Sequence, residues 1–247
     1  MKIKLILFSI AAVFISSAGV YMFSQKPSED NMAPVPQDEG VYDPQINPSE
    51  FTTDITNKYF TLTPGKKFVY ESETEDGRER IEVEVLGETR NVLGVETVVY
   101  WDRVWLDDVL IEDTRDYLAQ DAEGNVWYFG EAVDNYENGT LKDHAGSWLA
   151  GVDGAKPGIW MKADPTVGQQ YRQEYYPGEA EDMGEVLSLT ETVTTPSGTY
   201  QNCLKTRDWT PLDLSVEEHK YYCIEVGGLV LEVHTDSGER TELIAVQ

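Results

Sequence analysis

The sequence predicts an all-β fold, an antiparallel meander that forms a barrel-like or two-sheet sandwich domain. From residue 66 to the C-terminus, short segments alternate apolar and polar residues with a period of two. Turn residues separate these segments at intervals of about 8 to 12 residues, as in sandwiches and up-and-down barrels. Asp76-Gly77 and Asn138-Gly139 are typical of tight hairpin turns, which need residues that tolerate positive φ.

The alternation places strands in a continuous series along the chain. We expect them at 66–74, 78–86, 96–106, 109–118, 126–129, 133–137, 141–144, 170–176, 184–194, 199–210, 217–225, 229–235 and 240–246. Between two of these strands, Gly and Pro residues in 146–167 predict a long loop across one end of the domain. Its Trp148, Trp160 and Met161 favour a plug for the core, although long loops also carry binding sites.

The N-terminal part differs from the rest of the chain. Residues 1–25 combine two early lysines with an uncharged apolar run, which predicts a signal peptide or, if it is not cleaved, an N-terminal membrane anchor. Residues 26–50 are rich in Pro and acidic side chains, which predicts a disordered linker. Residues 51–247 then form a single domain, and the protein is expected to be extracytoplasmic, either periplasmic or secreted.

The chain is strongly acidic, with 45 Asp and Glu against 19 Lys and Arg and a formal net charge of −26. Nucleic acids are excluded as partners because their phosphates would be repelled, and a membrane is expected only through the N-terminal segment. Cations and basic partners are favoured, although the charge also serves solubility alone.

Two cysteines lie in a predicted hairpin whose centre is Asp213. Cys203 and Cys223 are equidistant from that centre, so a symmetric antiparallel hairpin places them opposite each other, within reach of a disulfide. A bulge that shifts the register by one residue would instead point them to opposite faces. We expect a cross-strand disulfide, since exported proteins meet an oxidising compartment.

Several sequence segments within residues 51–247 resemble those of an uncharacterised family of exported bacterial β-rich proteins. The segments are Ile55-Thr56-Asn57-Lys58-Tyr59-Phe60, Glu112-Asp113-Thr114-Arg115-Asp116-Tyr117, Asn125-Val126-Trp127-Tyr128-Phe129-Gly130-Glu131, Gly151-Val152-Asp153-Gly154-Ala155-Lys156-Pro157-Gly158 and Tyr171-Arg172-Gln173-Glu174-Tyr175-Tyr176-Pro177-Gly178. The resemblance implies export and no established activity. This chain departs from the family pattern near Cys223, so the resemblance does not extend the disulfide to the family.

Charged residues alternate with aromatic residues inside several strands and form the first candidate site. Trp101, Arg103 and Trp105 share one face of their strand by the period-two rule. The full candidate set for a small anionic or zwitterionic ligand is Arg103, Arg115, Arg172, Glu174 and Arg207. If these faces point inward they line a polar cavity, and if they point outward they form cross-strand ion pairs.

Acidic turns form the second candidate site, for a cation such as Ca²⁺, which prefers several oxygen ligands. The residues are Asp121, Glu123, Asn125, Glu179, Glu181 and Asp182, and neither turn matches the EF-hand pattern. The alternative is that both are ordinary solvated turns. No cofactor other than this Ca²⁺ is expected.

Enzyme signatures are missing from the sequence. His144, His219 and His234 lack metal-ligand spacing, and there is no nucleophile elbow, P-loop or dinucleotide-binding glycine pattern. We therefore expect a non-catalytic binding domain for a small ligand or a cell-envelope protein. A Ca²⁺-binding or purely structural envelope protein is the alternative, and a hydrolase that uses paired carboxylates is the third hypothesis.

Overall fold

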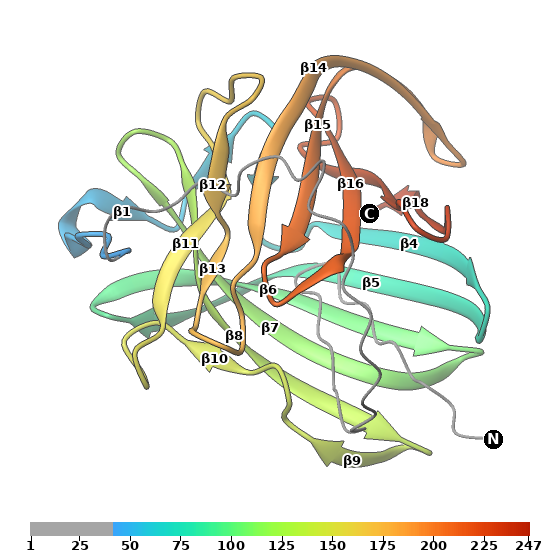
Figure 1. The fold of residues 1–247 in the computed structure, drawn as a ribbon, viewed down its shortest axis with the longest axis horizontal. Coiled ribbons are helices and arrows are strands. Elements are labelled where there is room, and N and C mark those ends of the chain that lie inside the picture. The colour runs from blue at the N-terminus through green and yellow to red at the C-terminus, as the bar shows by residue number, and fades with distance from the viewer. Residues whose placement is uncertain (1–41) are drawn as a thin grey trace, which may run out of the picture.

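The computed structural model describes residues 42–247, and the predicted signal segment and most of the predicted linker lie outside this part. The described chain is almost entirely antiparallel β-structure, which confirms the predicted all-β fold (Figure 1). Its elements are η1 (Pro48–Glu50), β1 (Phe51–Thr52), β2 (Ile55–Asn57), β3 (Phe60–Leu62), β4 (Lys67–Thr74), β5 (Gly77–Val92), β6 (Val95–Leu106), β7 (Val109–Asp121), β8 (Val126–Glu137), β9 (Thr140–Asp143), β10 (Trp148–Leu149), β11 (Lys156–Met161), β12 (Gln170–Arg172), β13 (Glu174–Tyr175), β14 (Met183–Thr195), β15 (Gly198–Thr210), β16 (Asp213–Cys223), β17 (Gly228–His234) and β18 (Arg240–Val246). Within residues 42–247, no helix is long and apolar enough to span a bilayer.

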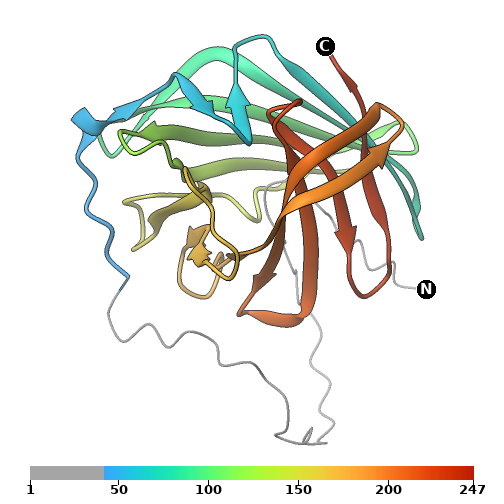
Figure 2. The same cartoon turned by 90° about the horizontal axis from the view of Figure 1, so that it is seen from above.

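One large sheet curls into a nearly closed barrel. Its strand order is β12-β14-β15-β16-β17-β18-β4-β5-β6-β7-β8-β11-β13, and the β2–β3 hairpin forms a small second sheet. The two edge strands, β12 and β13, are separated in sequence only by Gln173. The edges therefore meet at one short segment. Figures 1 and 2 show β4–β8 as one set of long strands and β14–β16 as a second set that crosses them.

Two sequence predictions about strand ends are wrong. Residues 126–137 form the single strand β8 instead of two strands, because Gly130 continues the strand at φ 123°, where its missing Cβ also leaves room for the Trp148 backbone. The predicted loop 146–167 contains β10 and β11, which both pair with β8. Its large side chains are nevertheless buried in the core, as the plug interpretation predicts.

The barrel interior is divided into an apolar part and an acidic part. The apolar part is covered by the β2–β3 hairpin, where Phe60 packs against Tyr100, Trp160 and Tyr222 with ring centroids 5.5 to 6.4 Å apart. The acidic part lies toward the hairpins β4–β5, β6–β7, β15–β16 and β17–β18, which the strand register brings to the same end. Both parts are buried.

The disulfide between Cys203 and Cys223 is present, with Cα atoms 4.3 Å apart. The β15–β16 ladder pairs Leu204 with Tyr222, which is the register of the symmetric hairpin. A bulge does occur in this hairpin, but it falls between Trp209 and Thr210, close to the turn. The cysteines lie on the far side of the bulge from the turn, and the six residue pairs from Leu204–Tyr222 to Trp209–Glu217 keep the predicted register.

Candidate functional site

The inner face of the barrel carries an unusual number of buried carboxyl groups. We call them, with the two basic residues among them, the acidic compartment: Glu79, Asp102, Glu112, Asp116, Glu131, Glu174, Asp208, Glu218 and Glu232, with Lys220 and His234. All eleven side chains are less than a tenth exposed. Charged groups are rarely buried so completely unless they are paired or bind a ligand, so the pairing of each one decides what the compartment can do.

Strand alternation places these side chains inside. In β6, Tyr100, Asp102 and Val104 are buried, whereas Trp101 and Arg103 between them are partly exposed. The same alternation selects Glu112 and Asp116 in β7. The acidic residues therefore occupy positions that would be apolar in an ordinary barrel strand.

Five residues on β15–β17, which we call the paired group, combine three carboxylates with one ammonium and one imidazole. They are Asp208, Glu218, Lys220, Glu232 and His234. The Lys220 ammonium lies 3.3 to 3.6 Å from carboxylate oxygens of Asp208, Glu218 and Glu232. Burial acts to lower the pKa of Lys220, but these carboxylates raise it well above its usual value. The ammonium is therefore permanently charged.

The other six carboxyl groups, which we call the unpaired group, lie beyond ion-pair distance of every basic residue in the described chain. They are Glu79, Asp102, Glu112, Asp116, Glu131 and Glu174, and within residues 42–247 none of them forms an ion pair. Hydroxyl groups supply the few hydrogen bonds: Tyr128 donates to Asp116 at 2.6 Å, and Thr114 donates to Glu112 at 2.8 Å.

Asp102 is an isolated member of the unpaired group. It is 1% exposed, and neither of its carboxyl oxygens has a hydrogen-bond partner among the described residues. The same is true of both oxygens of Glu131, which is 2% exposed, and of one oxygen each of Glu174 and Asp116. Buried acceptors without donors are costly, so each of these atoms is suited to a ligand that brings its own donors.

Burial changes the proton affinity of the unpaired group. Loss of solvent, with a further contribution from neighbouring carboxyl groups, raises the pKa of Glu79 to about 8. Burial likewise raises the pKa of Glu112 and of Asp116 to about 7, and the pKa of Asp102 well above its usual value. In the absence of a cation, these carboxyl groups therefore hold protons at or near neutral pH.

The predicted arginine set lies elsewhere. Arg103 and Arg115 lie on the outer face of the sheet, where Arg103 stacks 3.8 Å from the Trp101 ring centroid and pairs with Glu82. Arg115 pairs with Asp113 at 2.8 Å. On another part of the barrel, Arg207 pairs with Glu185 and Glu217. Arg103 and Arg207 therefore form the cross-strand ion pairs that the sequence left open as the alternative, whereas Arg115 pairs within its own strand.

The remaining members of that set are close in sequence but face different surroundings. Arg172 lies over the rings of Tyr42 and Tyr175, at 5.6 and 5.0 Å from their centroids. Glu174 is buried in the acidic compartment. Of the five predicted ligand-binding residues, Glu174 alone belongs to that compartment.

The predicted cation ligands lie in two separate surface turns. Asp121 accepts hydrogen bonds from the Asn125 backbone N–H, the Asn125 amide and the Trp127 indole, so both carboxylate oxygens are engaged within the turn. Glu123 borders a shallow hollow of about 230 Å³ beside the β2–β3 hairpin. In the second turn Glu181 accepts from the Gly178 N–H at 2.8 Å, whereas Glu179 is exposed and Asp182 is partly exposed.

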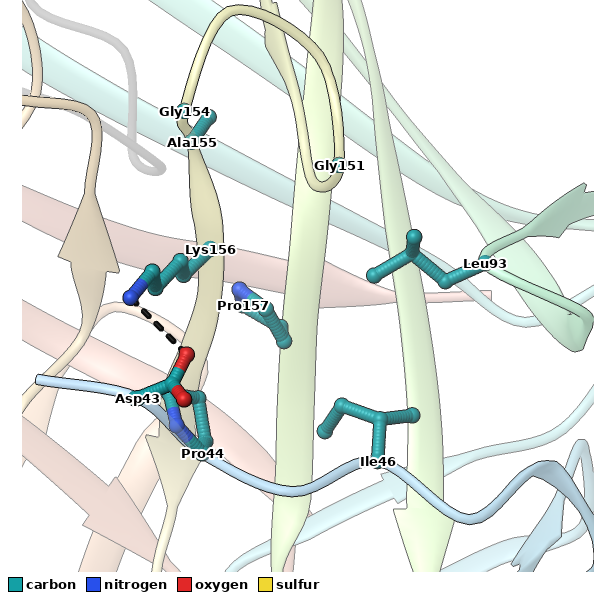
Figure 3. Close-up of a pocket in the computed structure, with 9 residues that line it drawn as sticks. All are labelled: Asp43, Pro44, Ile46, Leu93, Gly151, Gly154, Ala155, Lys156 and Pro157. Atoms are coloured by element: carbon teal, nitrogen blue, oxygen red, sulfur yellow. Dashed lines mark hydrogen bonds and ion pairs between the residues drawn. The ribbon is translucent and has the colours of Figure 1, made fainter.

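A larger surface hollow, of about 390 Å³, lies where residues 43–46 cross β11 (Figure 3). The Lys156 ammonium forms an ion pair with Asp43 at 2.9 Å and also donates to the Tyr42 carbonyl. The rest of the lining is apolar: Pro44, Ile46, Leu93, Ala155 and Pro157, with Gly151 and Gly154. Its one ion pair is already satisfied, so the hollow offers little to orient a ligand.

Comparisons with known proteins assign no activity. No family model and no curated protein matches the chain, in agreement with the expectation that the resemblance brings no established function. Among solved structures, a candidate lipoprotein from Parabacteroides distasonis is similar, with 15% sequence identity and a TM-score of 0.42 over 76% of this chain and 98% of that chain. A likeness at this level carries no argument about function.

Proposed function

We propose that this protein is an extracytoplasmic binding domain that takes up a small organic cation in the unpaired group of the acidic compartment. The observation that carries the proposal is Asp102, a fully buried carboxyl group whose two oxygens accept no hydrogen bond from any described residue. Of the other buried carboxyl groups in the unpaired group, Glu112, Asp116 and Glu79 lie near enough to raise its pKa further. A cation would supply both the missing donors and the missing positive charge.

The disulfide supports the extracytoplasmic part of the proposal. Disulfides form and persist in oxidising compartments such as the periplasm, and are rare in the cytosol. The Cys203–Cys223 bond therefore agrees with the export signal that the N-terminal sequence predicts.

An ammonium compound fits the unpaired group better than a bare metal ion. Within the described chain, the only three metal-ligating residues with ligand atoms within 4.8 Å of one another are Glu218, Glu232 and His234, all outside the unpaired group. No three carboxyl groups of the unpaired group in the described chain meet this distance limit. They suit an alkylammonium better, because its three N–H donors can reach several acceptors.

Aromatic side chains beside the carboxyl groups favour the same ligand class. The Tyr128 hydroxyl donates to Asp116, and its ring packs at 5.2 Å from Trp148 and 4.9 Å from Trp160, measured between centroids. Buried aromatic rings stabilise organic cations through their π faces. The net charge of −26 would also attract cations over a distance.

Binding should release protons. The pKa values of Glu112 and Asp116 are raised to about 7 because these groups are buried without a counter-charge. A bound cation stabilises the ionised carboxylates and lowers those pKa values, so protons leave as the ligand binds. Affinity for the cation should therefore rise with pH between about 6 and 8.

The experiment is a thermal-shift screen of the purified protein against mono- and diammonium compounds, with neutral alcohols of the same shape and small carboxylates as controls. We expect a saturable rise in melting temperature with ammonium compounds only. The Asp102→Asn variant should lose the shift, whereas Asp76→Asn, in an exposed hairpin turn, should keep it. A shift with carboxylates that is lost in Arg103→Ala would instead favour the outer arginine set, and no shift with any ammonium compound would contradict the proposal.

A further inference from the structure

We propose that the paired group also contains a site for one divalent transition-metal ion, with Glu218, Glu232 and His234 as ligands. Glu218 lies directly opposite His234 in the β16–β17 ladder, and Glu232 precedes His234 by two residues on the same face. Each residue offers one ligand atom, and the three atoms lie within 4.8 Å of one another. This site shares no residue with the organic-cation site proposed above, and the proposal does not rest on that site.

The donor chemistry favours zinc or a similar ion over calcium. One imidazole nitrogen and two carboxylate oxygens form a set that Zn²⁺ and neighbouring transition metals bind readily. Ca²⁺ requires six to eight oxygens and rarely uses imidazole. Three protein ligands also leave a tetrahedral ion one open position.

Lys220 and His234 contact different carboxylate oxygens of Glu218 and Glu232. The Lys220 ammonium contacts the Oε2 atoms of Glu218 and Glu232, at 3.3 and 3.6 Å. The His234 ring nitrogens contact the Oε1 atoms of the same glutamates, at 3.4 and 3.5 Å. A metal ion on the Oε1 side therefore leaves the Lys220 contacts in place.

Asp208 adds a third buried carboxyl group next to the proposed ligands. Its carboxyl group is 5% exposed and lies directly opposite Glu218 in the β15–β16 ladder. Oδ2 accepts from the Gln173 amide and pairs with Lys220, but Oδ1 has no partner in the described chain. Three carboxylates face one ammonium here, so a divalent ion brings the local charge to neutrality.

The test uses the purified protein after removal of metal with a chelator. Co²⁺ serves as the probe, because its visible absorption reports coordination geometry, and Zn²⁺ is titrated in competition by calorimetry. We expect one ion per chain, an intense four-coordinate Co²⁺ spectrum and displacement of Co²⁺ by Zn²⁺ but not by Ca²⁺.

Variants then locate the ion. Loss of an outer-shell partner of a metal ligand weakens metal binding by about 10- to 100-fold, so loss of a ligand in His234→Gln or Glu218→Gln should weaken it by at least that much. His144→Gln is the matched control, since that ring is exposed on another part of the barrel. Wild-type protein that binds no stoichiometric Co²⁺ or Zn²⁺ would overturn the proposal without any variant. Binding that survives in a folded His234→Gln protein would overturn it too.

Discussion

Asp102 lies directly opposite Thr114 in the β6–β7 ladder, and both side chains are buried inside the barrel, yet the Thr114 hydroxyl donates to Glu112 and not to Asp102. The nearest cross-strand donor is thus already engaged with another carboxyl group. Asp102 is left with two unpartnered oxygens. An interior that leaves a carboxyl group in this condition is poorly suited to stability alone, and this is why we assign it to binding.

We predict that the ligand-free protein loses stability as pH rises. Burial raises the pKa of Glu79 to about 8, and of Glu112 and Asp116 to about 7, so the folded state keeps protons that the unfolded chain releases above about pH 4. Each retained proton lowers the free energy of unfolding by about 1.4 kcal/mol per pH unit between these pKa values. Urea unfolding at intervals from pH 4.5 to 8.5 measures this slope. A stability that stays level or increases over that range would contradict the prediction.

Replacing Asp102 by Asn should stabilise the ligand-free protein at pH 8. Asn has a similar shape and no proton to lose, so the variant avoids the penalty that the raised pKa of Asp102 imposes. The gain should shrink toward pH 4, because an unfolded Asp then also binds a proton about half of the time. Denaturant unfolding of the wild type and the variant at pH 8 and pH 4 measures this difference in stability. Lower stability of the variant at pH 8 would show that the carboxylate is paired in the folded protein.

Removing the disulfide should lower stability by about 3 kcal/mol, because the bond closes a loop of 20 residues in the unfolded chain. The Cys203→Ser, Cys223→Ser double variant should keep the fold, since the β15–β16 ladder continues from Leu204–Tyr222 to Trp209–Glu217. Chemical denaturation of the oxidised, reduced and double-variant proteins tests this. Equal stability of the oxidised and reduced wild type would be the contrary result.

Closure of the barrel depends on Gly158. A Cβ at this position would lie 2.1 Å from the Gln173 carbonyl oxygen, where β13 meets β11. Gly158→Ala should therefore force the edge segment away and destabilise the protein by at least about 1 to 3 kcal/mol. Gly87→Ala is the control, since a Cβ there meets nothing within 4 Å. The two variants should differ clearly in melting temperature, and equal values would argue against the close approach at this edge.

The fold class could be predicted from sequence because period-two alternation and turn residues are local signals. The β15–β16 hairpin shows the strength of such signals. From Leu204 to Trp209, residues equidistant from Asp213 are paired and Cys203 meets Cys223, although the turn itself lies at 211–212 and Asp213 pairs with Thr210. Strand ends were harder to predict. The sequence predicted separate strands at 126–129 and 133–137, but Gly130 lies within the single strand β8, where its small size allows close packing. The Gly and Pro residues in 146–167 predicted a loop, whereas β11 in this range pairs at the barrel edge.

The candidate site could be predicted only in part. Alternation correctly grouped Trp101, Arg103 and Trp105 on one face, but it does not say which face is inside. Arginine between tryptophans suggested a cavity, whereas the buried face carries Asp102. Asp102, an acid on the same face as the apolar Tyr100 and Val104, was the available signal. Their convergence from several strands depends on the register of the whole barrel, which no single segment reveals.

The most direct test of the binding proposal is isothermal titration calorimetry of the protein with the best diammonium compound from the screen, repeated at pH 7 in buffers of different ionisation enthalpy. The dependence of the observed enthalpy on the buffer gives the number of protons released. We expect saturable binding with release of at least about one proton, and neither effect in Asp102→Asn. Binding without proton release, or equal binding by the variant, would contradict the account.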